Sequence, residues 1–571
     1  MTMAFPASRP AFLVPPALYG LRLEGRKRII SLWNLFRQWG GGGGGGGTIM
    51  TEPKETRQNM AAPIAMQYGR ELSYNRHELP VRVQVGRWLA LFMDADHPHH
   101  RAEYRLVAVL FLRLLALVYL AAFASIGIQI AGLAGPEGLL PAVDMLLASR
   151  ETFWQHPTLF WLDASGPTLE GAAWLGCILA VALFFNMLPR LCLGGLFVLY
   201  LSLMHTAPLF MDDTGDHLLL EAGFLAIFLV WGTSVIRLYR WLMFRLLFLS
   251  GAAKVLGQNA GQGWTDLTAL DYFFETQPLP HVGAWLAHHW PESVLHAAGG
   301  IILFTELVGA FFLFLPRGPR FLTAWALIAV QGGLLLTGNH GLVNVLVLAL
   351  YVLLFDDRAL KRVVPWPLLH MLFPWRPPVR GGWGRAPLVA GMAGIAGIVG
   401  GVQILEALSG HHAPPPLATF MAAVQPFHLV NAYKKAHALW PATPSERLEL
   451  AVEGSNDGIH WRSYIFAYKP GELEIRPPLT VLHQPRLDRL MVAATRGDAA
   501  AEAVASRVLP GHLLRGNRTV TALLARDPFF GSRPRWVRRV LYRYRFTDPD
   551  TRAVTGHWWK RAVVHVFPPG I

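Results

Sequence analysis

Residues 244–280 read FRLLFLSGAAKVLGQNAGQGWTDLTALDYFFETQPLP, and this stretch contains the two features that decide the fold. Its first part is an apolar, helix-like run that carries Lys254 near its end. Its second part is a long loop with acidic and aromatic residues but neither lysine nor arginine. An ionisable amine at the end of an apolar run, beside a loop without basic residues, indicates a membrane helix whose loop lies on the non-cytoplasmic side.

The composition of the whole chain supports a membrane protein. Of its 571 residues, 53% are hydrophobic and only 15% are charged. The mean hydropathy is +0.33, which is high for a soluble enzyme of this length. The net charge of +14 would suit nucleic acid or an anionic membrane surface, and the long apolar runs favour the membrane. Two cysteines, Cys177 and Cys192, argue against a disulfide framework.

Apolar runs and short polar breaks alternate between residues 104 and 407. Most of the runs approach the roughly 20 residues that a helix needs to cross a bilayer. We therefore expect a polytopic α-helical membrane bundle of about eight or nine transmembrane helices over this region. The candidate spans are 106–132, 172–188, 191–211, 218–236, 238–256, 299–316, 321–337, 341–355 and 386–407.

The loops between these runs alternate in charge along the chain. Most charged residues in the loop 133–171 are acidic, and so are all those of MDDTGD at 211–216. The loops RLYR at 237–240 and RGPR at 317–320 are basic. Basic loops remain on the cytoplasmic side of a membrane. The pattern predicts a cytoplasmic N-terminus, and nine spans then place the chain after residue 407 outside the cytoplasm.

The two ends of the chain differ in character from this region. Residues 1–100 include eight consecutive glycines at 40–47, followed by Met50 as a candidate start, and we expect a disordered, low-complexity extension. In residues 415–571, polar and apolar residues alternate on both sides of NDG at 456–458, whereas 485–526 has a helical pattern. This predicts a small β-sandwich domain with a helical insert, docked on the non-cytoplasmic face.

The predicted topology places the rare polar residues of the spans towards the outer leaflet. They are Glu221, Lys254, Glu306, Gln331, Asn339, His340 and Asn344. Ionisable groups at this depth are costly unless they are paired or hydrated, so they are candidates for function. Two interpretations stay open: Glu221 and Lys254 form a structural ion pair, or the polar residues line a functional cavity. Arg245 is expected nearer the inner leaflet, where it can snorkel.

Motifs for metals and nucleotides do not match this sequence. The histidines at 281–296 and at 411–412 lack the spacing of metal ligands. We therefore expect no metal site, no cofactor and no nucleic-acid partner.

Several long motifs resemble the lipase maturation factor family. They are DHLLLEAGFLAIFL (216–229), FRLLFLSGAAKVL (244–256), WTDLTALDYFFETQPLP (264–280), TELVGAFFLFLPR (305–317), GNHGLVNVLVLAL (338–350), DD (356–357), FHLVNAY (427–433), VEGSNDGIHWRSYIFAYKPG (452–471), HQPRLD (483–488) and LYRYRFTD (541–548). The resemblance covers roughly residues 104–571.

This resemblance implies a chaperone-like membrane protein that helps secreted lipases to fold and assemble. Its partners would be membrane lipid and a secreted client protein. A bacterial member would lie in the inner membrane with a periplasmic domain, and animal members lie in the endoplasmic reticulum membrane. The resemblance makes the following motif residues candidates for client binding: Trp264, Tyr272, Glu275, Gln277, Asn431, Tyr433, Arg486 and Asp488.

A weaker similarity offers an alternative. SGAAKVL followed by QGW is similar to the intramembrane helix of vitamin K-dependent carboxylases, in which a lysine acts as a base. The matching positions in this chain are Gly251, Lys254 and Trp264. This similarity implies an intramembrane enzyme with Lys254 as its catalytic base. A Glu221 counter-ion would oppose that role because it would hold the amine charged.

Overall fold

The computed structural model describes residues 103–148, 153–230, 233–256, 263–363, 386–433, 446–480 and 482–569. All of these residues belong to one compact unit, Val81–Ile571. The predicted extension 1–100, with its glycine tract and Met50, lies outside the described residues. The basic stretch 364–385 also lies outside them.

Within the described residues, a helix occupies each of the nine predicted spans. These helices are α4 (Arg105–Gly127), α7 (Gly166–Phe184), α8 (Pro189–Thr206), α9 (Thr214–Leu229), α10 (Ile236–Leu256), α13 (Glu292–Phe304) with its continuation α14 (Ala310–Phe312), α15 (Arg317–Thr337), α16 (Leu342–Val352) and α19 (Ala386–Ser409). A π-helical turn, η4 (Thr305–Gly309), joins α13 to α14.

Five of these helical segments are long and apolar enough to cross a membrane, so the chain is a multi-pass integral membrane protein. They are Arg105–Gly127, Gly166–Phe184, Glu292–Phe312, Arg317–Thr337 and Pro387–Ser409. The number of spans beyond these five stays a prediction. The helix α16 is only 11 residues long, and α10 carries four basic residues among its apolar ones.

Close packing of α4 against α7 forms one wall of the bundle. Phe111, Leu115 and Tyr119 recur at helical spacing on α4, and all three are fully buried. A Cβ atom at Gly176 of α7 would overlap the ring of Phe123, so the glycine lets the two helices approach closely. The opposite face of α7 exposes apolar side chains such as Ile178, as expected for contact with lipid.

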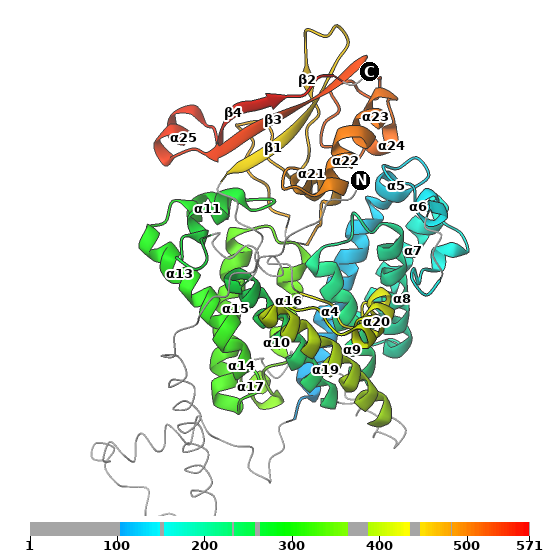
Figure 1. The fold of residues 1–571 in the computed structure, drawn as a ribbon, viewed down its shortest axis with the longest axis vertical. Coiled ribbons are helices and arrows are strands. Elements are labelled where there is room, and N and C mark those ends of the chain that lie inside the picture. Colours follow the sequence, from blue (N-terminus) through cyan, green and yellow to red (C-terminus); the bar gives the residue numbers. More distant parts are fainter. Residues whose placement is uncertain are drawn as a thin grey trace, which may run out of the picture. The chain divides into compact units, whose positions relative to one another are not determined.

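Short helices lie between the long ones along the chain (Figure 1). Their bounds are α5 (Ile130–Ala134), α6 (Ala142–Ala148), η2 (Leu159–Trp161), η3 (Thr233–Val235), α11 (Ala269–Thr276), α12 (Val282–His288), α17 (Asp357–Val363), α20 (Pro415–Val424) and η6 (Gln425–Phe427). At the end of the bundle away from this domain, Asp357 accepts hydrogen bonds from the backbone amides of Arg105 and Val107 and caps α4.

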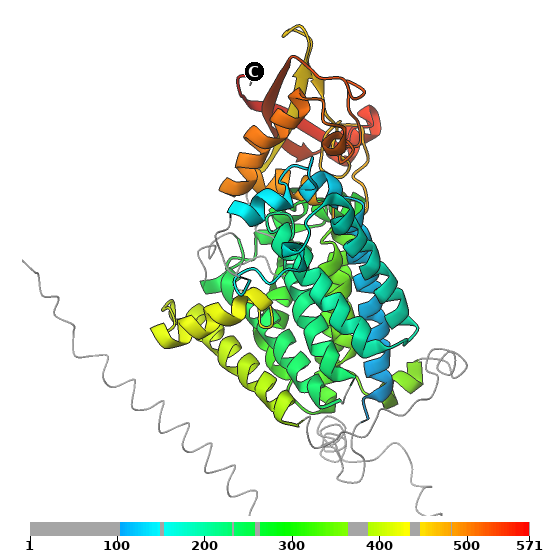
Figure 2. The same cartoon turned by 90° about the vertical axis from the view of Figure 1, so that its right-hand side faces the viewer.

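A single antiparallel sheet forms the centre of the C-terminal domain. Its strands are β1 (Arg447–Ser455), β2 (Arg462–Ser463), β3 (Trp536–Phe546) and β4 (Trp559–Val566), in the order β2-β1-β3-β4. Gly458, in the predicted NDG turn between β1 and β2, has a φ of +72°. Figure 2 shows this domain at one end of the helical bundle.

The described residues form this one sheet instead of the two packed sheets of a sandwich. Helices take the place of a second sheet: α21 (Arg486–Ala494) packs on β1 and α23 (Leu509–Leu514) packs on β3. The other helices of the domain are α22 (Ala499–Ala503), the π-helical turn η7 (Val504–Val508), α24 (Arg518–Thr521) and, between β3 and β4, α25 (Pro549–Thr555). Strand alternation in the sequence identifies a buried sheet face but does not tell what covers it.

Candidate functional site

A buried ion pair joins α10 to the π-helical turn η4. Lys254 Nζ lies 2.7 Å from Glu306 Oε2, 2.9 Å from Glu306 Oε1 and 2.8 Å from Ser250 Oγ. The side chains of Lys254 and Glu306 are only 1% and 2% exposed. A Cβ atom at Gly251 would lie 3.0 Å from Glu306 Cβ, so this glycine permits the close approach of the two segments. The Trp264 ring lies over the amine, 5.1 Å from Nζ to the ring centroid.

The structure does not contain the Glu221–Lys254 ion pair that was one of the two open interpretations. Glu221 of α9 forms its ion pair with Arg245 of α10, and both side chains are buried. Arg245 therefore does not snorkel, and it also donates to the backbone carbonyl of Asn431 at 3.1 Å. Lys254 lies nine residues after Arg245, which is two and a half helical turns, so it faces another neighbour.

The FHLVNAY segment is anchored on Glu221. The backbone amide of Asn431 donates to Glu221 Oε2 at 2.8 Å, and the Tyr433 hydroxyl donates to the same oxygen at 3.0 Å. The Asn431 side chain donates to the carbonyl of His217 at 2.9 Å. A carboxylate with this many donors is well compensated for its burial. The start of the C-terminal region is thereby attached to α9 and α10.

The HQPRLD motif forms a second attachment. Arg486 is 3% exposed and binds both carboxylate oxygens of Asp216, which is fully buried at the start of α9. Burial would lower the pKa of Arg486, but Asp216 raises it above its ordinary value. Tyr200 donates to Asp216 Oδ1 at 2.5 Å. The backbone amide of Arg486 donates to Gln129 Oε1 at 2.9 Å, which ties the motif to the end of α4 as well.

Asp488 stabilises the domain internally. It accepts hydrogen bonds from the backbone amides of Tyr468 and Lys469, at 2.8 and 2.9 Å. Burial raises the pKa of Asp488, although these two amides oppose the rise. The carboxylate therefore fixes the loop after β2 to α21.

The loop 263–281 forms a third attachment through α11. Glu275 Oε2 accepts the backbone amide of Phe546, at the end of β3, at 2.8 Å. Arg447, the first residue of β1, donates to the carbonyls of Glu275 and Gln277 at 3.0 and 2.5 Å. Gln277 in turn donates to the carbonyl of Thr337, at the end of α15, at 2.8 Å. This chain of contacts links the sheet to the bundle through the loop.

The Arg447 guanidinium also belongs to a buried charge cluster beneath the sheet. Arg447 and Lys469 bind the two oxygens of Glu449, at 2.5 and 2.9 Å. Burial would raise the pKa of Glu449, but Lys469 and Arg447 lower it below its ordinary value. Burial raises the pKa of Glu275, which has no such direct ion pair with a lysine or arginine among the described residues.

The remaining predicted polar residues lie in two further places. Gln331 donates to Asn344 Oδ1 at 2.7 Å, and this contact joins α15 to α16. Asn339 donates to the carbonyl of Pro478 at 2.7 Å, so it contacts the C-terminal domain. His340 stacks on Phe273, with 5.8 Å between the ring centroids. Glu221 with Arg245, Lys254 with Glu306, and Gln331 with Asn344 thus form three separate pairs.

Burial separates the eight client-binding candidates into two kinds. Seven are buried in the internal contacts described above: Trp264, Glu275, Gln277, Asn431, Tyr433, Arg486 and Asp488. Tyr272, by contrast, is 47% exposed on α11. Whether any of the eight contacts a client stays a prediction.

Reasoning from the sequence missed several partners in these attachments. Asp216, Arg447 and Gln129 each form a buried contact across the boundary between bundle and domain. Asp216 could have been noticed because it is a second acidic residue within the apolar DHLLLEAGFL run. Arg447 and Gln129 carry no such signal, because polar residues at the end of a strand or helix are common.

The chemistry of Lys254 fits a structural role. Its amine is enclosed by the Glu306 carboxylate and Ser250, and a general base needs a free amine within reach of a substrate. In the described part of the chain, no three His, Cys, Asp or Glu side chains are placed to hold a metal ion. The geometry gives the carboxylase alternative no support.

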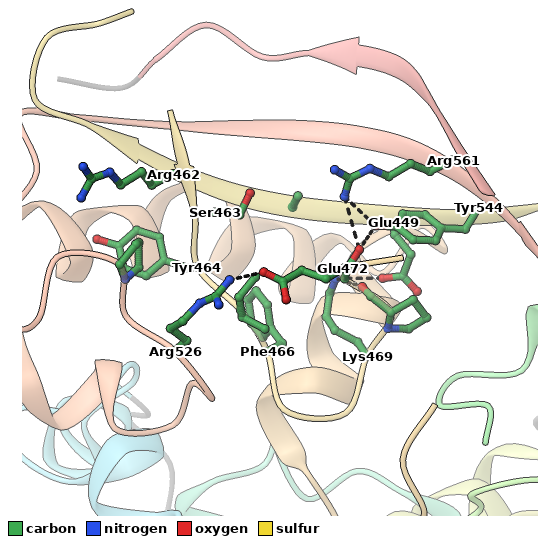
Figure 3. Close-up of a pocket in the computed structure, with 15 residues that line it drawn as sticks. Glu449, Arg462, Ser463, Tyr464, Phe466, Lys469, Glu472, Arg526, Tyr544 and Arg561 are labelled. Atoms are coloured by element: carbon green, nitrogen blue, oxygen red, sulfur yellow. Dashed lines mark hydrogen bonds and ion pairs between the residues drawn. The ribbon is translucent and has the colours of Figure 1, made fainter. Parts of the chain in front are cut away.

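The C-terminal domain also contains a surface cavity of about 370 Å³ on one face of the sheet (Figure 3). Arg462, Arg526 and Arg561 lie around it, and Glu472 pairs with Arg526. Tyr544 and Arg561 lie together at one side, and the Arg561 guanidinium donates to the Tyr544 hydroxyl at 3.1 Å. The surface of this domain is therefore rich in arginine.

Comparison with known proteins assigns both parts of the chain. The lipase maturation factor transmembrane domain model matches residues 106–362, and the lipase maturation factor C-terminal domain model matches residues 429–569. Lipase maturation factor 1 of Homo sapiens is 30% identical, with 89% of this chain and 95% of the relative covered. Lipase maturation factor 2 is 30% identical in Homo sapiens and 29% in Xenopus laevis, with 82% of this chain and 83% of each relative covered. No solved structure matches the chain.

Proposed function

This chain belongs to the lipase maturation factor family, and we propose that it is a membrane-embedded factor that helps secreted lipases to reach their folded state. The names of its relatives supply the client class, and the match extends over the bundle and the C-terminal domain. The proposed action is chaperone-like and needs no cofactor.

The observation that carries this proposal is the triple attachment of the C-terminal domain. Arg486 with Asp216, Asn431 with Glu221, and Arg447 with the loop after α11 hold the domain on one end of the bundle through buried contacts. Arg486 with Asp216 is a buried ion pair, and removing one partner of such a pair costs about 3–5 kcal/mol. Together the three contacts hold the domain in one orientation. The sheet and the loop then form a fixed surface against which a secreted chain can fold. We call this surface the platform, and it comprises residues 263–291, 446–480 and 482–569.

We further propose that the platform lies outside the cytoplasm. The alternation of acidic and basic loops supports nine spans with a cytoplasmic N-terminus. The compartment is the periplasm if the source is bacterial and the lumen of the endoplasmic reticulum in a eukaryotic cell. Five of the seven buried motif residues lie within the platform and hold its shape, and Tyr272 is available to a client.

Cysteine labelling tests the topology. Cys177 and Cys192 are the only cysteines of the chain, so a background without them needs two substitutions. Ile459, which is 76% exposed in the C-terminal domain, is then changed to cysteine. An impermeant maleimide applied to intact bacterial spheroplasts should label Ile459→Cys. Labelling only after the membrane is permeabilised would place the platform in the cytoplasm and overturn the proposal.

Co-expression with a secreted lipase tests the function. The lipase activity per mass of secreted lipase should rise when the full chain is present. Arg486→Met should remove most of this rise, because it leaves Asp216 buried and unpaired. Arg476→Met is the matched control, since Arg476 is exposed in the same domain. The same specific activity with and without the wild-type chain would refute the proposed function.

A further inference from the structure

Strand β4 is the exposed edge of the sheet. Trp559 at its start is buried, and each of the following seven residues, 560–566, is exposed. Val563, Val564 and Val566 are 59%, 44% and 45% exposed. In Figure 1, β4 lies at the margin of the sheet away from the helical bundle. An exposed edge strand with apolar side chains is a template for pairing with another chain.

The hydrogen bonding of β3 shows which backbone groups of β4 point outward. Phe546 is paired with Trp559 in register, yet its amide donates to Glu275 and not to β4. Bonded and non-bonded pairs alternate along an antiparallel ladder. The pairs of Tyr544 with Arg561 and of Tyr542 with Val563 are therefore also non-bonded. The N–H and C=O groups of Arg561 and Val563 thus face the open edge, where the described residues provide no backbone partner for them.

Charge at this edge indicates the kind of chain that it would accept. Arg545 lies directly opposite Lys560 in the register, and like charges in this arrangement destabilise a sheet. In the part of the chain that the structure describes, neither side chain has a carboxylate within ion-pair distance. Arg561, the next residue of β4, points to the other face of the sheet, where it contacts Tyr542, Tyr544 and the carbonyl of Gly471. An acidic residue on an added strand would offset this repulsion.

We propose that the outer edge of β4 binds an extended, acidic segment of the secreted client and adds it to the sheet as a fifth strand. Main-chain hydrogen bonds to Arg561 and Val563 would give affinity. Acidic side chains would face Lys560 and its neighbours, and apolar ones would cover the exposed valines. This inference rests on the proposed function, because the client is the secreted lipase.

Binding of designed peptides to the detergent-purified full chain tests the edge directly. The probe is a fluorescein-labelled peptide of about ten alternating valine and glutamate residues, which matches the length of a long strand. The comparison peptide has lysine in place of glutamate. Fluorescence anisotropy should show that the glutamate peptide binds at least about tenfold more tightly. Equal affinity of the two peptides would overturn the charge argument.

Backbone substitution at Val563 tests the strand pairing. Val563→Pro removes an outward N–H, and proline is tolerated where an edge strand faces solvent. It should weaken the glutamate peptide about tenfold, whereas Val563→Thr retains the N–H and should bind within about twofold of wild type. Lys560→Glu leaves the backbone intact and should reverse the preference between the two peptides. Unchanged binding in both Val563→Pro and Lys560→Glu would refute the inference.

Crosslinking in cells identifies the occupant. A photo-crosslinking residue at Val564 should capture the co-expressed lipase, and one at Ile459, which is exposed in the turn between β1 and β2, should not. Capture of a second copy of this chain at Val564 would replace the client with self-association and overturn the proposal. If wild type activates the lipase and Val563→Pro does so equally well, the edge proposal fails while the proposed function stands. If wild type activates no lipase, the proposed function fails.

Discussion

Replacing Lys254 by methionine should destabilise the bundle strongly. Methionine has a similar length but no charge, so the substitution leaves the Glu306 carboxylate buried without its cation. The amine lies 2.7 Å from Glu306 Oε2, and both side chains are at most 2% exposed. Removing one partner of such a pair costs about 3–5 kcal/mol of the free energy of unfolding. Glu306→Met should cost a similar amount, because it leaves the lysine unpaired.

The double variant distinguishes a lost charge partner from a lost packing contact. With Lys254→Met and Glu306→Met together, no buried charge remains, and replacement of a buried ion pair by apolar residues is often neutral. The double variant should therefore be more stable than either single variant by at least about 2 kcal/mol. Denaturant titration of the purified protein in detergent, followed by tryptophan fluorescence, measures these values, with the exposed Lys361→Met as the control.

Two outcomes would contradict this reasoning. One is a loss below about 1 kcal/mol for Lys254→Met, which is the range of an exposed pair. The other is a double variant whose loss equals the sum of the two single losses, because independent sites are additive. Loss of lipase activation without loss of stability would instead return Lys254 to a direct functional role.

Three further predictions concern pH, helix packing and capping. Burial lowers the pKa of His340 to about 3 and that of His428 to about 4. A histidine in the unfolded chain has a pKa of about 6.5, so below that pH the unfolded chain binds more protons than the folded chain. The free energy of unfolding should therefore be highest above that pH and should fall on acidification to pH 5, by about 2 kcal/mol for His340 alone. Thermal unfolding across this pH range measures the fall, and His340→Gln should make the free energy of unfolding less dependent on pH. Gly176→Leu should disrupt the contact of α4 with α7 by about 1–3 kcal/mol in the same assay, whereas Gly171→Leu, on the open face of α7, should be nearly neutral. Asp357→Ala should cost about 1 kcal/mol because it removes the cap of α4, and a loss of less than a few tenths would show that solvent replaces it.

The positions of the helices could be predicted because hydropathy depends on local sequence alone. Each of the nine predicted ranges contains a helix among the described residues, and the strands on both sides of NDG at 456–458 are present. Alternation and turn chemistry are also local signals. That the described residues form one sheet instead of two was not predictable in this way, since the helices that cover β1 and β3 come from other parts of the chain.

Charge partners could not be assigned from the sequence. Glu221 and Lys254 lie near the same predicted depth, but the choice of partner depends on how α10 is rotated about its axis. Arg245 faces α9 and Lys254 faces η4, because nine residues change the direction of a helical side chain. The resemblance to the lipase maturation factor family likewise identified the motif residues, but it did not indicate which of them are buried. Most of them hold the molecule together, as Arg486 does on Asp216.

The order of the strands has a consequence for biosynthesis. The long partner of β1 is β3, so the pair of Arg447 with Tyr544 cannot form before Tyr544 has been translated. The bundle helices and the FHLVNAY segment leave the ribosome earlier and can already occupy their places in the membrane. During this interval β1 has only the two-residue strand β2 as a partner, and its other edge is unpaired. An unpaired strand edge favours aggregation, so the C-terminal domain is most exposed to this hazard while its last residues are still being made.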